Sequence, residues 1–104
     1  MGDDYVATQN FSKERSDTKI KEPKMYNVVM LNDDFTTMEF VVRILVSIFH
    51  KDEISAHALM MTVHKNGKAV VGKYPYDIAS TKIKNALELA KQEGYPFRMK
   101  MEEA

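Results

Sequence analysis

Asn32, Asp33 and Asp34 stand in a row directly after an apolar run, and they bring one amide and two carboxylates together. Paired carboxylates can act as general acid and base, and carboxylate and amide oxygens can also hold a cation. The same residue types dominate turns and helix caps, because their side chains bond to nearby backbone groups. A structural turn and a cation-binding site are therefore both open interpretations of this segment.

Three histidines, His50, His57 and His64, are spaced seven residues apart, which raises the question of a metal site. In a helix, His57 and His64 would lie two turns apart, about 10.5 Å, whereas helical zinc ligands come four residues apart. The spacing therefore predicts no metal site. His64 differs from the other two, because it shares the late turns of a predicted helix with the apolar Met60 and Val63.

Methionine is abundant, with eight in 104 residues, and most of these fall within predicted helices and strands. Methionine usually fills a core, but it can also line a groove that adapts to different apolar guests. In either case the polar cluster at residues 32–34 accompanies a surplus of apolar side chains. Such a site suits a cation that is attached to an apolar group.

Other chemistries lack support in the sequence. The chain has no Cys, which rules out disulfides, thiolate metal sites and a cysteine nucleophile, and which suits a reducing cytoplasm. Its four glycines form neither a phosphate-binding loop nor a nucleophile elbow. We therefore expect no catalytic residue, no cofactor and no metal, although a hydrolase that uses carboxylates and a histidine stays an alternative.

Charge and hydropathy exclude further classes. Fifteen Lys and Arg balance fifteen Asp and Glu, and the basic residues are scattered among acids, so nucleic acid is not an expected partner. Apolar stretches such as Val28–Leu31 and Phe40–Val42 are far shorter than the roughly 20 residues of a membrane span. The polar start does not fit a signal peptide. We expect a cytoplasmic protein that does not enter a membrane.

Two regions differ in pattern. Residues 1–24 carry charges of mixed sign without a sustained apolar period, and such a segment buries too little surface to offset its ordering entropy. The sequence predicts a flexible N-terminal arm there. Residues 25–104 then form one small domain.

The first half of this domain is predicted to be a strand followed by a helix. Residues 25–32 are rich in β-branched and aromatic side chains, and residues 32–37 are typical of a turn that leads into a helix cap. A helix over residues 38–49 is apolar except for Glu39, Arg43 and Ser47, which recur every four residues. Glu39 and Arg43 have the spacing of an intrahelical ion pair.

The second half is predicted to contain two helices and two strands. Asp52 caps a helix that ends at Gly67, with Ile54, Ala58 and Met61 as one inward row and Ala56, Leu59, Met60 and Val63 as another. A strand follows over residues 67–74, then a helix from Pro75 to Gly94 and an alternating strand over residues 97–102. The prediction is an α/β (α+β) fold: a small sandwich of a three-stranded antiparallel sheet with three helices on one side, in the order β-α-α-β-α-β.

The string LNDDFTTMEFV at residues 31–41, followed by LMMTVH at residues 59–64 and NGKA at residues 66–69, resembles the ClpS family of bacterial adaptor proteins. The likeness covers about residues 24–104, and these motifs at this spacing are far more specific than any single short motif. ClpS adaptors are similar in fold to the C-terminal domain of the ribosomal stalk protein, and they carry a mobile N-terminal extension. The order of elements derived above agrees with that fold.

The resemblance implies an adaptor and not an enzyme. ClpS adaptors bind proteins with an N-terminal Leu, Phe, Tyr or Trp, the bacterial N-degron. They deliver these proteins to the N-terminal domain of an AAA+ unfoldase of the ClpA or ClpC type, for degradation by ClpP. The partners of this chain would then be such an unfoldase and N-degron substrates, and we expect a monomer without a cofactor.

The resemblance also implies residue roles. Asn32, Asp34 and His64 correspond to the groups that hold the substrate's α-amino group, and Asp33 would add negative potential. Asp77 and Lys82 correspond to a charged patch that faces the unfoldase. Met38 corresponds to the residue that screens branching at the guest's β carbon. The side-chain pocket would consist of Leu31, Thr36, Met38, Val41, Met60, Val63 and Phe97.

Two departures from the family pattern stand out. Thr37 occupies a position where many relatives have Pro, and Phe97 one where relatives often have Leu, which would crowd the pocket floor. The ranking among Leu, Phe, Tyr and Trp is therefore open, as is the choice between ClpA and ClpC. A ribosome-associated or scaffold domain is the alternative, since the stalk fold is shared and fold alone does not fix function.

Overall fold

The structure is a computed structural model, and it describes residues 22–104. The elements are β2 (Met25–Leu31), α1 (Met38–Ser47), α2 (Glu53–Asn66), β3 (Lys68–Pro75), α3 (Tyr76–Gln92) and β4 (Arg98–Glu103). This order, β-α-α-β-α-β, confirms the predicted fold class. The flexible arm was predicted over residues 1–24, and of these, residues 1–21 lie outside the described residues.

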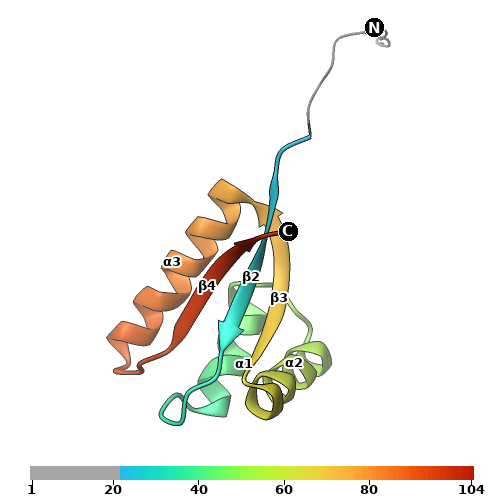
Figure 1. The fold of residues 1–104 in the computed structure, drawn as a ribbon. Helices are drawn as coiled ribbons and strands as arrows, with labels where there is room; N and C mark the ends of the chain where they lie inside the picture. The colour runs from blue at the N-terminus through green and yellow to red at the C-terminus, as the bar shows by residue number, and fades with distance from the viewer. Residues whose placement is uncertain (1–21) are drawn as a thin grey trace, which may run out of the picture.

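The three strands form one antiparallel sheet in the order β3-β2-β4. Figure 1 shows α3 running alongside the sheet, and α1 and α2 together near the end where β2 finishes. A single core joins the buried side chains of all three helices to the inner sheet face, including Val28, Met30 and Met99. The helices therefore pack on one side of the sheet, as predicted. Within the described residues no helix combines the length and apolar character needed to cross a bilayer.

A β-bulge adjusts which side chains of β3 face the core. Val28 pairs with Gly72 and Val29 with Val70, so Val71 is an extra residue in the ladder. Val71 is 1% exposed in the core, while its neighbour Val70 is 51% exposed on the open face. The extra residue shifts the alternation of β3 beyond this point, so that Val71 and Gly72 both stand opposite Val28 on the inner face.

Local signals set the helix ends. The Asp52 side chain accepts a hydrogen bond from Ser55 N–H at the start of α2, and Gly67 ends that helix in the left-handed conformation at φ 87°. α1 ends at Ser47, two residues before the predicted Phe49, because the following segment turns to bury the Phe49 ring. Both ends of α2 match the prediction to within a residue.

One predicted inward row of α2 is wrong. Ile54 is 82% exposed and Met61 37% exposed, and Ala58 is exposed as well. The other row is right, since Ala56, Met60 and Val63 are buried and Leu59 is half-buried. α2 is an outer element that packs through one face only, so the apolar residues on its far side stay in contact with solvent.

Candidate functional site

The loop between β2 and α1 is built around the Asp33 carboxylate. Its Oδ1 accepts hydrogen bonds from the backbone N–H groups of Phe35 and Thr36, both at 2.8 Å. Its Oδ2 accepts one from the Thr36 hydroxyl at 2.7 Å. Partial burial by itself raises the pKa of Asp33, but these hydrogen bonds and the charge of Arg98 outweigh it and lower the pKa below its ordinary value. Asp33 is therefore ionised and fully used in shaping the loop.

The end of α2 is tied to the end of β2 through Gly67. The Gly67 N–H donates to Val63 O at 2.9 Å, and the Gly67 carbonyl accepts from Asn32 N–H at 2.9 Å. The left-handed backbone that permits this turn favours glycine. His64 lies one turn before Gly67, so this link brings the His64 end of α2 beside the Asn32 loop.

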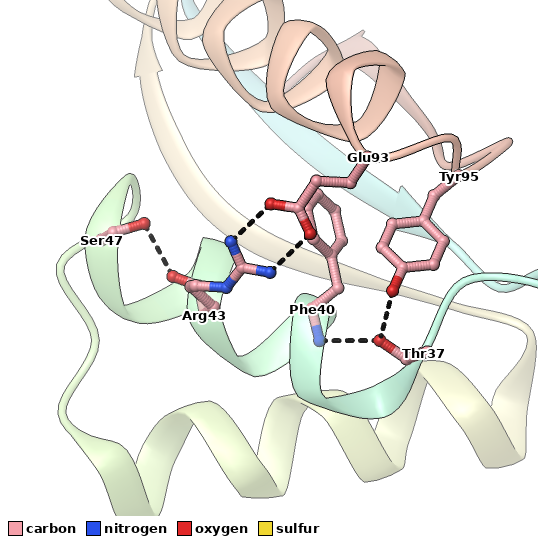
Figure 2. A network of polar contacts seen from close by, with 6 residues as sticks. All are labelled: Thr37, Phe40, Arg43, Ser47, Glu93 and Tyr95. Carbon is pink, nitrogen blue, oxygen red and sulfur yellow. Dashed lines mark hydrogen bonds and ion pairs between the residues drawn. The ribbon is translucent and has the colours of Figure 1, made fainter.

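The start of α1 is fixed by polar contacts that Figure 2 shows. The Thr37 hydroxyl accepts from Phe40 N–H at 3.1 Å as the helix cap, and it donates a weak 3.4 Å bond to the Tyr95 hydroxyl. Thr37 thus caps the helix by accepting a hydrogen bond on its hydroxyl, which a proline side chain could not do.

A bidentate ion pair joins α1 to the end of α3. Arg43 donates to both Glu93 carboxylate oxygens, at 2.6 and 2.7 Å (Figure 2). These hydrogen bonds lower the pKa of Glu93 below its ordinary value. The predicted Glu39–Arg43 pair within the helix is not the one that forms, because the fold brings Glu93 to the exposed side of α1. The orientation of α1 is therefore fixed by two contacts, the Thr37 cap at its start and the Arg43–Glu93 ion pair in its middle.

A cavity of about 270 Å³ opens between these three segments. The loop supplies its polar side and the facing sides of α1 and α2 supply its apolar walls. Asp34 is exposed, and no hydrogen bond within residues 22–104 engages its carboxylate. His64 is exposed as well, whereas Met60 and Val63 are buried. The lining consists of Asn32, Asp33, Asp34, Thr36, Met38, Val41, Met60, Val63 and His64.

This arrangement suits a primary ammonium group that carries an apolar substituent. Carboxylate, amide and imidazole acceptors are among the side chains that line the cavity, and charge-assisted hydrogen bonds are stronger than neutral ones. An engineered cavity of about 150 Å³ already accommodates benzene, so the volume here is sufficient for a leucine or an aromatic side chain. Among the described residues, no three or more His, Asp or Glu side chains are grouped in a way that could hold a metal ion.

All nine residues that line the cavity were among those the sequence suggested for the site. Two others lie elsewhere. Leu31 pairs with Lys68 and Arg98 and lies on the sheet face opposite the one that buries Met30, and it does not line this cavity. Phe97 is 5% exposed and packs edge-on against Phe40, so it supports the cavity from the core without lining it.

The two residues suggested for unfoldase contact differ in environment. Asp77 is exposed in the first turn of α3. Lys82 is half-buried, and its ammonium donates to the Ile48 carbonyl at 2.7 Å and lies over the rings of Phe49 and Tyr74. Five helical residues also separate the two by about 140° around the axis. Lys82 therefore has a structural role, and the two side chains do not form one compact patch.

Sequence reasoning missed the residues that hold the site from outside. Glu93 and Tyr95 follow α3 and contact α1, and the Gly67 carbonyl binds Asn32. Gly67 was recognisable as a helix stop, but its carbonyl contact was not. No local pattern marks Glu93 as the partner of Arg43, because the two are fifty positions apart.

Comparisons with known proteins identify the family of this chain. The family model described as ATP-dependent Clp protease adaptor protein ClpS matches residues 21–100. A ClpS adapter protein of Clostridium acetobutylicum is 51% identical over 85 residues, which cover 82% of this chain and 84% of that protein. One of Syntrophus aciditrophicus is 47% identical, with 99% of each chain covered.

A solved structure is similar over the whole of its length. The structure of Agrobacterium tumefaciens ClpS2 bound to L-phenylalaninamide covers 80% of this chain and 100% of its own, with a TM-score of 0.77 and 42% sequence identity. The ligand of that protein carries a primary amine and an aromatic side chain.

Proposed function

The chain belongs to the ClpS family of Clp protease adaptors, which are not enzymes, and from this premise we propose that it captures proteins through a bulky apolar N-terminal residue. The observation that carries the proposal is one cavity that is lined both by hydrogen-bond acceptors and by apolar side chains. Phenylalaninamide, the ligand of the similar A. tumefaciens protein, has an amide in place of the carboxylate of free phenylalanine. In this it resembles a Phe at the N-terminus of a protein, whose carboxyl group forms the first peptide bond.

The acceptors divide into those that build the site and those that bind. Asp33 and Thr36 form hydrogen bonds with each other inside the loop. The side chains of Asn32, Asp34 and His64 are left to accept the three protons of an α-ammonium group. An α-amino group has a pKa near 8, so it is mostly cationic at pH 7. Asp34 supplies the opposite charge.

The apolar walls select the first side chain. Val41, Met60 and Val63 face the cavity from two helices, and removal of an apolar side chain from water stabilises the complex. Met38 is 44% exposed at the rim, where it would meet substituents on the β carbon of the guest. We propose that N-terminal Leu, Phe, Tyr and Trp fit and that β-branched Val and Ile do not.

Delivery requires a second contact. We propose that the protein acts as a monomer in the cytoplasm and docks on the N-terminal domain of a ClpA-type or ClpC-type unfoldase. Asp77 is the better candidate of the two α3 residues for direct contact, because it is exposed while Lys82 is engaged with Ile48. ClpP would then degrade the delivered substrate.

Titration with a labelled peptide tests the capture. A peptide that begins with Phe should bind, whereas the same peptide with an acetylated N-terminus should not, because an acetylated nitrogen carries no charge. A third peptide with Ala first and Phe second controls for non-specific hydrophobic binding. Equal binding of the free and acetylated peptides would contradict the proposal.

A further inference from the structure

A second cavity adjoins the first between α1 and α2. It has a volume of about 340 Å³ and is lined by Met38, Glu39, Val42, His57 and Met60. Met38 and Met60 belong to both cavities, so one layer of thioether side chains separates them. None of the acceptor residues of the first cavity lines the second.

The lining of this second cavity is apolar inside and polar at its edge. Val42 is half-buried and Met60 is 7% exposed, whereas Glu39 and His57 are exposed. Within the described part of the chain Glu39 takes part in no ion pair, since Arg43 is engaged with Glu93. The apolar surface therefore has room for a guest side chain of its own.

The spacing of the two cavities matches an extended peptide. Along α2 the first cavity uses residues 60–64 and the second residues 57–60, a displacement of about one helical turn, or 5.4 Å. In an extended chain, side chains two residues apart lie on the same face and about 6.6 Å apart. The next side chain after the first points the opposite way.

From this we propose that the second cavity is a subsite for an apolar side chain at the third position of the bound N-degron. The proposal rests on the proposed function, because the first residue must anchor the peptide before the third can reach Val42. Methionine walls adapt to guests of different shape, so Leu, Met and Phe should all be accepted there. The second position should have little effect.

Three peptides that begin with Phe test the subsite by fluorescence anisotropy: one with Ala at positions two and three, one with Leu at position two only, and one with Leu at position three only. We expect the third-position Leu to tighten binding roughly fivefold to tenfold over Ala, consistent with partial burial of its added carbons. The second-position Leu should leave affinity within about twofold.

The matched variants are Val42→Asn and Val46→Asn. Both valines are half-buried on α1 and one turn apart, but only Val42 lines the cavity. Val42→Asn should abolish the preference for Leu at position three and leave the affinity of the all-Ala peptide nearly unchanged, while Val46→Asn should keep the preference. If either Asn variant unfolds, Val42→Ala and Val46→Ala make the same comparison.

The outcomes separate the two proposals. Strong binding of Phe peptides with no third-position preference, or a preference that survives in Val42→Asn, would overturn the subsite and leave the proposed function standing. Failure of every free-amine peptide to bind would overturn both. A third-position preference that only Val42→Asn removes is the expected result.

Discussion

Replacing Asp33 and Asp34 separately with Ala should affect different properties of the protein, although the two carboxylates are neighbours. Asp33 accepts three hydrogen bonds at 2.7 to 2.8 Å, from Phe35 and Thr36, and all three stay inside the loop. Asp34 is exposed and accepts none within the described residues. Asp33→Ala should therefore reduce stability, and Asp34→Ala should reduce peptide affinity.

The magnitudes follow from the number and exposure of these contacts. A typical hydrogen bond contributes about 0.5 to 1.5 kcal/mol, and one of the three in the loop is exposed, so Asp33→Ala should lower the free energy of unfolding by about 1 to 3 kcal/mol. Asp34→Ala should change it by less than about 0.5 kcal/mol. Loss of a charge-assisted bond to the ammonium of the guest should weaken peptide binding by about 1.5 to 3 kcal/mol, roughly 10-fold to 100-fold.

Urea unfolding and peptide anisotropy on the same samples provide the assay. Asp33→Asn is the control, because its amide oxygen can keep the bonds from Phe35 and Thr36 N–H, and its loss should be smaller than that of Asp33→Ala. The stability contribution of Asp33 also depends on pH. Since its pKa is lowered in the folded state, the contribution is present above the unfolded value of about 3.9 and is lost as pH falls through the folded pKa. The gap between wild type and Asp33→Ala should close in that acid range. The reasoning fails if Asp34→Ala destabilises the fold as much as Asp33→Ala, or if it binds peptide like wild type.

Three more predictions test the pocket, α3 and the arm. Met38→Ala should raise the affinity ratio of Val-initiated to Leu-initiated peptides about tenfold, because it opens space at the β carbon; equal losses for both would show only a packing role. Lys82→Met should lower the free energy of unfolding, measured in urea, by about 1 to 2 kcal/mol, because it removes the hydrogen bond to the Ile48 carbonyl and the contacts with two rings. Asp77→Ala should leave the free energy of unfolding unchanged and weaken unfoldase binding in a pull-down titration. A variant that begins at Pro23 should bind peptide like the full chain but should not support degradation by unfoldase and protease, and full-rate degradation would refute a role of residues 1–22 in delivery.

The sequence predicted those parts of the fold that depend on local signals. Asp52 caps α2 through its own side chain, and Gly67 stops it through its own backbone angle, so both ends were evident without the fold. The partner of Arg43 was not, because a helical neighbour at Glu39 and a distant Glu93 satisfy the same charge, and only the packing of α3 decides between them. Local pattern fixes elements, while tertiary contacts fix their directions.

The residues that line the cavity could be expected from the sequence for a similar reason. Motif residues from Asn32 to Val41 and from Met60 to His64 lie in two short segments, and the Asn32–Gly67 hydrogen bond joins these segments directly. That Leu31 does not line the cavity could not be foreseen, because residues 28–31 are all apolar, and a continuous apolar run does not reveal which of its members face inward. The second cavity had no counterpart in the sequence, since Val42 and His57 are ordinary residues there.

The size of each contribution to the binding free energy explains why both a free amine and a bulky side chain would be needed. Association costs at least about 4 kcal/mol in lost translational and rotational freedom. Burial of one large apolar side chain contributes about 1.5 to 3 kcal/mol, so the cavity wall alone does not retain a guest. The amine contacts proposed for Asn32, Asp34 and His64 would be of similar size, because Asp34 and His64 are exposed and water competes for their hydrogen bonds. Only their sum exceeds the cost. An internal Phe lacks the amine and an N-terminal Ala lacks the side chain, so neither would be captured, and the loop that Asp33 holds in shape makes the two contributions available at the same time.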